Sequence, residues 1–152
     1  MAISDYEVSI TESSLHFPPR RGEVMAGAIV DFAGVVRVLE GSRFITGIAY
    51  EAHQEMAEHQ MRILAQTALE KFGVQFVFIR HRLGFVPAGD VSVIVRVESG
   101  HRTAAFNASQ WIMDELKRTV PIWKHPVFSA ASVSDAAITK VSASCDLPSA
   151  LA

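Results

Sequence analysis

The chain has 152 residues, of which 49% are hydrophobic and 20% charged, which is enough for one globular domain with a sizeable core. Its formal net charge of -2 argues against a nucleic-acid-binding protein held mainly by phosphate contacts, so any basic site must be local. The single cysteine, Cys145, cannot form an internal disulfide. No apolar run is long enough for a membrane helix, and the acidic N-terminus does not resemble a signal peptide. We therefore expect a cytoplasmic protein.

The first part of the chain predicts three strands. Residues 5–10 alternate between polar and apolar side chains and predict a short first strand, and residues 44–51 predict a further strand. Between them, residues 26–39 are apolar and β-branched, with an interruption at Gly34 that indicates a bulge or a close backbone approach. Arg37 follows this glycine, and it either points to solvent or directs its guanidinium at an anion.

A long amphipathic helix is predicted over residues 53–72, with Gly73 as its C-cap. Its buried stripe is expected to comprise Ala57, Met61, Leu64, Ala65, Ala68 and Phe72. His53 and His59 are six residues apart, whereas a helical zinc motif needs two histidines four apart. We therefore expect no metal site here.

Residues 74–82 and 91–98 are the clearest strands of the sequence. Residues 87–90, Pro-Ala-Gly-Asp, predict a turn between them, because proline presets one φ angle and glycine permits the next. The two strands are expected to form an antiparallel hairpin whose second strand leads to His101.

A second helix is predicted after this hairpin, with Thr103 as N-cap. Pro121 disfavours helical conformation at the residue before it, so the helix should end near residues 118–119. Its buried face is expected to contain Phe106, Ile112, Met113 and Leu116.

Cationic side chains lie at both ends of this helix. His101 and Arg102 precede its N-terminus, where free N–H groups and the helix dipole already favour an anion. Lys117 lies in its last turn, and Lys124 follows in an extended run whose alternation directs Lys124 to a pocket and buries Trp123. A solvated loop and cations that complement the dipole would explain the same pattern, so both interpretations stay open.

The order of the elements predicts an α+β domain, with two main helices packed on a mostly antiparallel sheet. We expect a single domain over residues 1–128 and a partly mobile, Ala/Ser-rich tail over 129–152. The chain has no catalytic serine elbow, P-loop or dinucleotide fingerprint, and its only cysteine lies in the tail.

Several separated segments carry a family resemblance, in matching order and spacing from about Gly27 to His125. They are FAGVVR at 32–37, YEAHQEM at 50–56, HRLGFVPAGDVSVIV at 81–95, HRTAAF at 101–106 and LKRTVPIWKH at 116–125. These segments closely resemble the large, catalytic subunit of molybdopterin synthase. The resemblance implies an α/β-hammerhead-like fold and a sulfurtransferase of molybdenum cofactor biosynthesis, which converts cyclic pyranopterin monophosphate into molybdopterin without a cofactor or metal of its own.

The resemblance also implies partners. Sulfur would arrive as a thiocarboxylate on the C-terminal glycine of a small ubiquitin-like subunit, and two large subunits would form the central dimer of a heterotetramer. A C2 homodimer also fits the high apolar content of the chain. Neither nucleic acid nor a membrane is expected as a partner.

By motif position, the family's active-site residues correspond to Arg37, His101, Arg102, Lys117 and Lys124. We expect Lys117 beside the thiocarboxylate carbonyl, Lys124 as acid/base, and the other three on phosphate and pterin, with His101 and Arg102 able to serve the neighbouring protomer. The resemblance further places Val35, Val36, His125 and Pro126 at the substrate site, with Val35 acting through its backbone.

General chemistry agrees with these assignments. The precursor and the thiocarboxylate are both anions, which arginine, histidine and lysine bind. A lysine crowded by other cations has a lowered pKa and can transfer protons near neutrality. Residues 129–139 lack the glycine, tryptophan and basic residue usual in the family. One alternative is therefore a non-catalytic, dimeric binding subunit that has lost turnover, and a more distant one uses His101 and Lys117 to cleave a phosphodiester.

Overall fold

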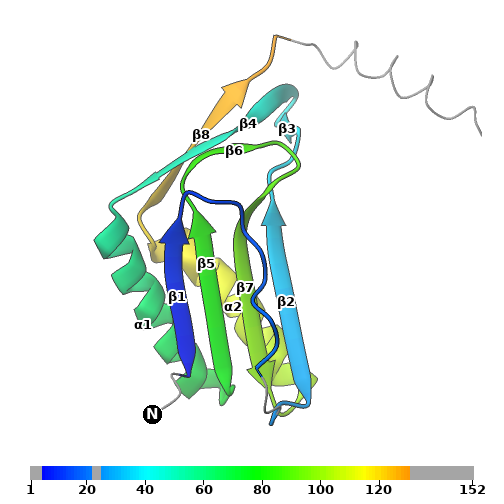
Figure 1. Ribbon diagram of the computed structural model, residues 1–152, viewed down its shortest axis with the longest axis vertical. Coiled ribbons are helices and arrows are strands. Elements are labelled where there is room, and N and C mark those ends of the chain that lie inside the picture. The colour runs from blue at the N-terminus through cyan, green and yellow to red at the C-terminus, as the bar shows by residue number, and fades with distance from the viewer. Residues whose placement is uncertain (1–4, 22–24, 131–152) are drawn as a thin grey trace, which may run out of the picture.

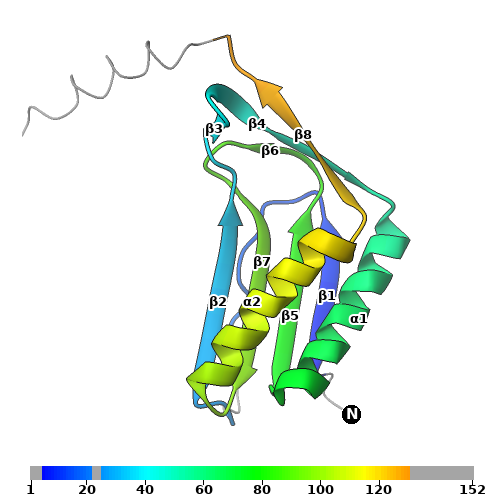
Figure 2. The ribbon, with the colours of Figure 1, turned by 180° about the vertical axis from the view of Figure 1, so that it is seen from behind.

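The computed structural model describes residues 5–21 and 25–130. A four-stranded sheet carries two long helices on one face, and a second, smaller sheet crosses the end of the first (Figures 1 and 2). The predicted tail lies outside the described residues from residue 131 onward, together with Cys145.

The four-stranded sheet has the order β1-β5-β7-β2. Its strands are β1 (Tyr6–Thr11), β2 (Ala28–Val35), β5 (Phe76–Arg82) and β7 (Val91–Ser99). Strands β5 and β7 pair in antiparallel fashion, as do β7 and β2, whereas β1 pairs with β5 in parallel. The expected α+β fold with a mostly antiparallel sheet is confirmed.

Helix α1 (Gln54–Phe72) fulfils the prediction made from its periodicity. The alanines, methionine and leucine of the expected stripe are buried against the sheet, and Phe72 is half-buried. Gly73 ends the helix at φ 62°, in the left-handed region that favours glycine, and its N–H donates to the Leu69 carbonyl.

Helix α2 (Arg102–Thr119) ends where Pro121 predicts, but its start and its buried face differ from expectation. His101 is the N-cap residue and makes no side-chain capping bond, so the prediction of Thr103 as N-cap is wrong. The buried face consists of Ala105, Ala108, Ser109, Ile112 and Leu116. Phe106 is 60% exposed, because one residue beyond Ala105 is a turn of about 100° away from that face.

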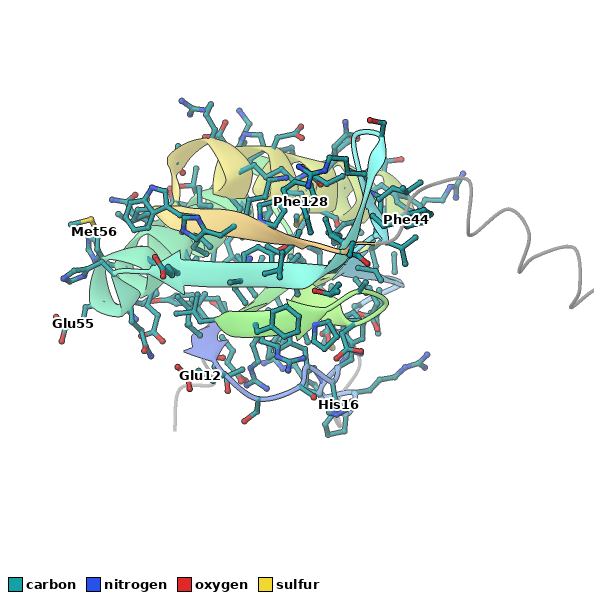
Figure 3. The ribbon with its side chains drawn as sticks, turned by 90° about the horizontal axis from the view of Figure 1, so that it is seen from above. Glu12, His16, Phe44, Glu55, Met56 and Phe128 are labelled. Carbon is teal, nitrogen blue, oxygen red and sulfur yellow. The ribbon has the colours of Figure 1, made fainter. Side chains whose placement is uncertain are left out.

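The second sheet is built around a long central strand, as the view from above shows (Figure 3). Its strands are β3 (Leu39–Glu40), β4 (Arg43–Ala52), β6 (Gly84–Pro87) and β8 (Ile122–Phe128), and β4 pairs with each of the others. Trp123 in β8 is 55% exposed, so the prediction that it is buried is wrong. It alternates with Ile122 and Lys124, which line a cleft, and therefore faces away from it.

The strand expected over residues 26–39 is divided between the two sheets. The register against β7 shifts between Gly34 and Val35, which confirms the irregularity predicted at this glycine. The Val36 N–H then donates to the Asp90 carbonyl at 2.9 Å, and the chain continues into β3. This break carries Arg37 from the first sheet to the junction of both.

The loop that follows β1 crosses the face of the sheet opposite the helices (Figure 1). Leu15 and Phe17 of this loop pack against apolar side chains of β5 and β7. Buried Arg96 makes a bidentate ion pair with Asp31 at 2.6 and 2.8 Å and donates to the Pro18 carbonyl at 2.7 Å. Among the described residues, no helix is long and apolar enough to cross a membrane.

Candidate active site

A cleft of about 730 Å³ lies at the junction of the two sheets, beside the C-terminal end of α2. Residues of β2, β3, β4, β5, β7, β8, α2 and the β2–β3 connection line it. Its charged lining residues are Arg37, Glu40, Lys117 and Lys124.

Three of the predicted cationic residues therefore meet in one cleft. Lys117 lies in the last turn of α2, and the chain reverses directly after it, with the Ile122 N–H donating to the Val120 carbonyl at 2.8 Å. The reversal starts β8, in which Lys124 pairs with Tyr50 of β4. The proline stop that ends the helix thus brings both lysines to the same cleft.

Val35 and Val36 also line the cleft. Val36 is buried, whereas Val35 is half exposed. Both lie where the chain leaves the first sheet, next to Arg37.

The electrostatic surroundings of Lys124 differ from our expectation of a lysine crowded by cations. Its Nζ lies 3.2 Å from Glu40 Oε1, and both side chains line the cleft. The sequence analysis gave no reason to expect this pairing. A carboxylate group thus lies beside Lys124 Nζ in the lining of the cleft.

His101 and Arg102 lie far from this cleft within one chain. Arg102 begins α2 and Lys117 comes 15 residues later, a distance of about 22 Å along the helix. Ala28 pairs with Ser99 while Val35 pairs with Val91, so the length of β2, about 23 Å, separates the region of His101 from that of Arg37. A single chain does not bring Arg37, His101 and Arg102 together, and only a second protomer could supply the latter two to this cleft.

His125 and Pro126 continue β8 beyond Lys124, and neither lines the cleft. They pair with Ala49 and Ile48 of β4. His125 Nε2 lies 3.4 Å from Glu51 Oε2 on an exposed surface.

The sequence analysis missed a buried histidine of the cleft, His81. It is 4% exposed, and its Nδ1 lies 2.8 Å from the Arg82 carbonyl oxygen. Burial lowers the pKa of His81 below its ordinary value, and the bond to the carbonyl opposes this effect more weakly, so the ring is neutral at pH 7. Its signal in the sequence was a histidine at the third position of the series Val77, Ile79, His81 on one face of a strand.

The Tyr50 ring packs against the His81 ring. The two ring centroids are 5.1 Å apart with an interplanar angle of 73°, an edge-to-face arrangement that is favourable for aromatic pairs. Among the described residues, no cluster of histidine, cysteine, aspartate and glutamate could hold a metal ion.

Fold and cleft together define a two-layer α+β protein that gathers one arginine and two lysines around a cavity large enough for a small anionic molecule. A family model described as MoaE protein matches residues 4–119, and the chain belongs to that family.

Several relatives are named molybdopterin synthase catalytic subunit, among them proteins from Thermoplasma volcanium and Bos taurus. The protein from Thermoplasma volcanium is 41% identical over 102 residues, which cover 67% of this chain and 74% of that protein. The Bos taurus protein is 39% identical over 111 residues, which cover 72% of this chain and 58% of that protein. The chain thus spans little more than half the length of the bovine relative.

A solved structure described as molybdopterin synthase from Staphylococcus aureus has the same fold. It superposes with a TM-score of 0.69 at 27% sequence identity, covering 86% of this chain and 96% of that one. A second structure, described as a molybdopterin biosynthesis MoaE protein from Burkholderia ambifaria, gives a TM-score of 0.66 at 26% identity.

Proposed function

We propose that the chain is the catalytic subunit of a molybdopterin synthase, a sulfurtransferase that acts in molybdenum cofactor biosynthesis. Its substrate is cyclic pyranopterin monophosphate, and its sulfur donor is the C-terminal thiocarboxylate of a small ubiquitin-like partner subunit. The observation that carries this proposal is the convergence of Arg37, Lys117 and Lys124 on one cleft in a chain of the MoaE family.

The chemistry divides between binding and proton transfer. Arg37, with His101 and Arg102 of a second protomer, binds the phosphate and the pterin, because guanidinium groups pair well with phosphate oxygens. The thiocarboxylate sulfur attacks a substrate carbon that bears oxygen, so that a C–S bond forms and the C–O bond breaks. Lys124 protonates the departing oxygen, and Lys117 donates to the thiocarboxylate carbonyl.

Each transfer leaves a thioester between the substrate sulfur and the partner's glycine. Water then hydrolyses this thioester, which leaves the sulfur on the pterin and a carboxylate on the partner. A second thiocarboxylate supplies the second sulfur of the dithiolene. Glu40 lies 3.2 Å from Lys124 and can take up or return its proton between these steps.

The proposed assembly is a homodimer that binds one small subunit at each end. The dimer is part of the proposal because the cleft of one chain lacks His101 and Arg102. We further propose a cytoplasmic location, with no bound cofactor and with neither nucleic acid nor a membrane as a partner. The alternative of a binding subunit without turnover is less favoured, because both lysines remain and line the cleft.

The test is reconstitution of molybdopterin formation from the purified chain, a thiocarboxylated partner and the pterin precursor. Lys117→Ala and Lys124→Ala should each fold normally and lower the rate by about a hundredfold or more, the range of lost acid–base catalysis. Arg118→Ala is the matched control, because Arg118 neighbours Lys117 but pairs with Glu115 and does not line the cleft. Normal rates in both lysine variants would refute the assignment, and an inactive wild-type chain would favour the binding subunit.

A further inference from the structure

His81 is a buried residue of the cleft to which the proposed function assigns no role. It lies on the helix-covered face of β5, where its register neighbours are Val93 in β7 and Ile10 in β1. Both neighbours are buried, and an aliphatic side chain would continue the series Val77 and Ile79 on the same face. A histidine here is therefore not required by the core.

The orientation of the ring is fixed from two sides. A carbonyl oxygen can only accept, so Nδ1 donates its hydrogen to the Arg82 carbonyl at 2.8 Å, and Nε2 of the neutral ring carries a lone pair. Tyr50 packs edge to face against the ring at 5.1 Å. The ring is thus held in one tautomer before any ligand arrives.

Nε2 is the unsatisfied atom of this arrangement. No described residue makes a hydrogen bond to it. Among the described residues, two side-chain atoms are both unpaired and closed off from solvent, Arg82 Nε and Glu98 Oε1, and Nε2 of His81 is not one of them. Nε2 is therefore not closed off from solvent, and because His81 is 4% exposed and lines the cleft, we infer that this atom opens to the cleft. A ligand bound in the cleft can thus donate a hydrogen bond to Nε2.

The cations of the cleft cannot do this work, because Arg37, Lys117 and Lys124 are donors without acceptor capacity. One oxygen of the Glu40 carboxylate is already paired with Lys124. These cations suit the phosphate and the thiocarboxylate. The donor groups of a heterocyclic substrate, its ring N–H and O–H groups, need an acceptor instead.

We propose that His81 Nε2 accepts a hydrogen bond from an N–H or O–H group of the substrate's pterin ring system, and so selects the heterocycle while the cations select the anion. This inference rests on the proposed function, because it names the group that recognises the substrate of the same cleft. A site built to accept a hydrogen bond discriminates strongly against a ligand that lacks the donor.

The experiment measures dissociation constants of two probes, the pterin precursor and inorganic phosphate, by calorimetry on the intact chain. His81→Phe keeps a planar ring beside Tyr50 but removes the acceptor, and should weaken precursor binding by about tenfold, the loss of one buried hydrogen bond. Phosphate binding should not change. His81→Gln retains an acceptor and should bind the precursor more tightly than His81→Phe, and thermal melting of each variant verifies folding.

The outcomes separate this inference from the proposed function. A wild-type chain that binds phosphate but not the precursor overturns the proposed function. A wild-type chain that binds the precursor, with His81→Phe binding it equally well or losing phosphate in parallel, overturns the role of His81 alone.

A second measurement uses no variant and so covers a His81→Phe chain that does not fold. In the wild-type chain labelled with ¹⁵N-histidine, the precursor should shift the Nε2 resonance of His81, whereas inorganic phosphate should leave it in place. A Nε2 resonance that does not respond to bound precursor contradicts the proposal.

Discussion

The separation of the cationic residues along α2 makes a quantitative prediction about mixed dimers. Arg102 and Lys117 lie about 22 Å apart in one chain, beyond the combined reach of their side chains. In the proposed dimer, an active cleft therefore takes Lys117 from one protomer and Arg102 from the other. Arg102→Ala and Lys117→Ala homodimers should each be inactive. A mixed dimer has one cleft that lacks both groups and one that is intact.

Random exchange of the two variants puts about half of the molecules in mixed dimers, so the mixture should recover about a quarter of the wild-type activity per cleft. The assay is molybdopterin formation after the variants are mixed, unfolded and refolded together, with light scattering to verify the dimer mass. Refolding each variant alone is the control. A mixture no more active than its components, in verified mixed dimers, would show that the residues act within one chain or not at all.

Two further predictions concern stability. Asp31→Ala should lower the free energy of unfolding by about 1.5–3 kcal/mol, because it leaves the buried Arg96 guanidinium without its charged partner. Glu115→Ala breaks the exposed pair with Arg118 and should change the free energy of unfolding little. Urea denaturation measures both variants. Burial lowers the pKa of His81 below its ordinary value of 6.5, so the unfolded chain binds a proton at this histidine more readily than the folded chain does. Titration of His81 should therefore leave the folded state unaffected above about pH 6.5 and destabilise it as the pH falls below that value. His81→Phe should reduce this loss between about pH 7.5 and about pH 5.5, and an unchanged pH dependence would contradict the neutral state of the ring.

Local patterns predicted the elements that a single periodicity determines. The stripe of α1 and its glycine cap follow from spacing and backbone sterics, and the alternation of residues 91–98 defines β7. The parallel pairing of β1 with β5 does not follow from any local pattern, because it joins segments about 70 residues apart. The second sheet was missed for the same reason, since β6 and β8 pair with a strand, β4, that lies far from them along the chain.

The candidate site divides in the same way. Motif positions identified Arg37, Lys117 and Lys124, which meet in the cleft. The separation of His101 from them depends on strand register and on the direction of α2, neither of which a motif contains. His81 was overlooked because a histidine in an apolar strand is usually a core residue, and its free nitrogen becomes evident only from its contacts.

The most direct test of the central claim follows the sulfur atom itself. A partner subunit whose C-terminal thiocarboxylate carries isotopically labelled sulfur is mixed with the pterin precursor and the wild-type chain, and the product is analysed by mass spectrometry. We predict label in both dithiolene sulfurs of molybdopterin and an unlabelled carboxylate on the spent partner. Label that stays on the partner while the precursor remains unchanged would contradict the account.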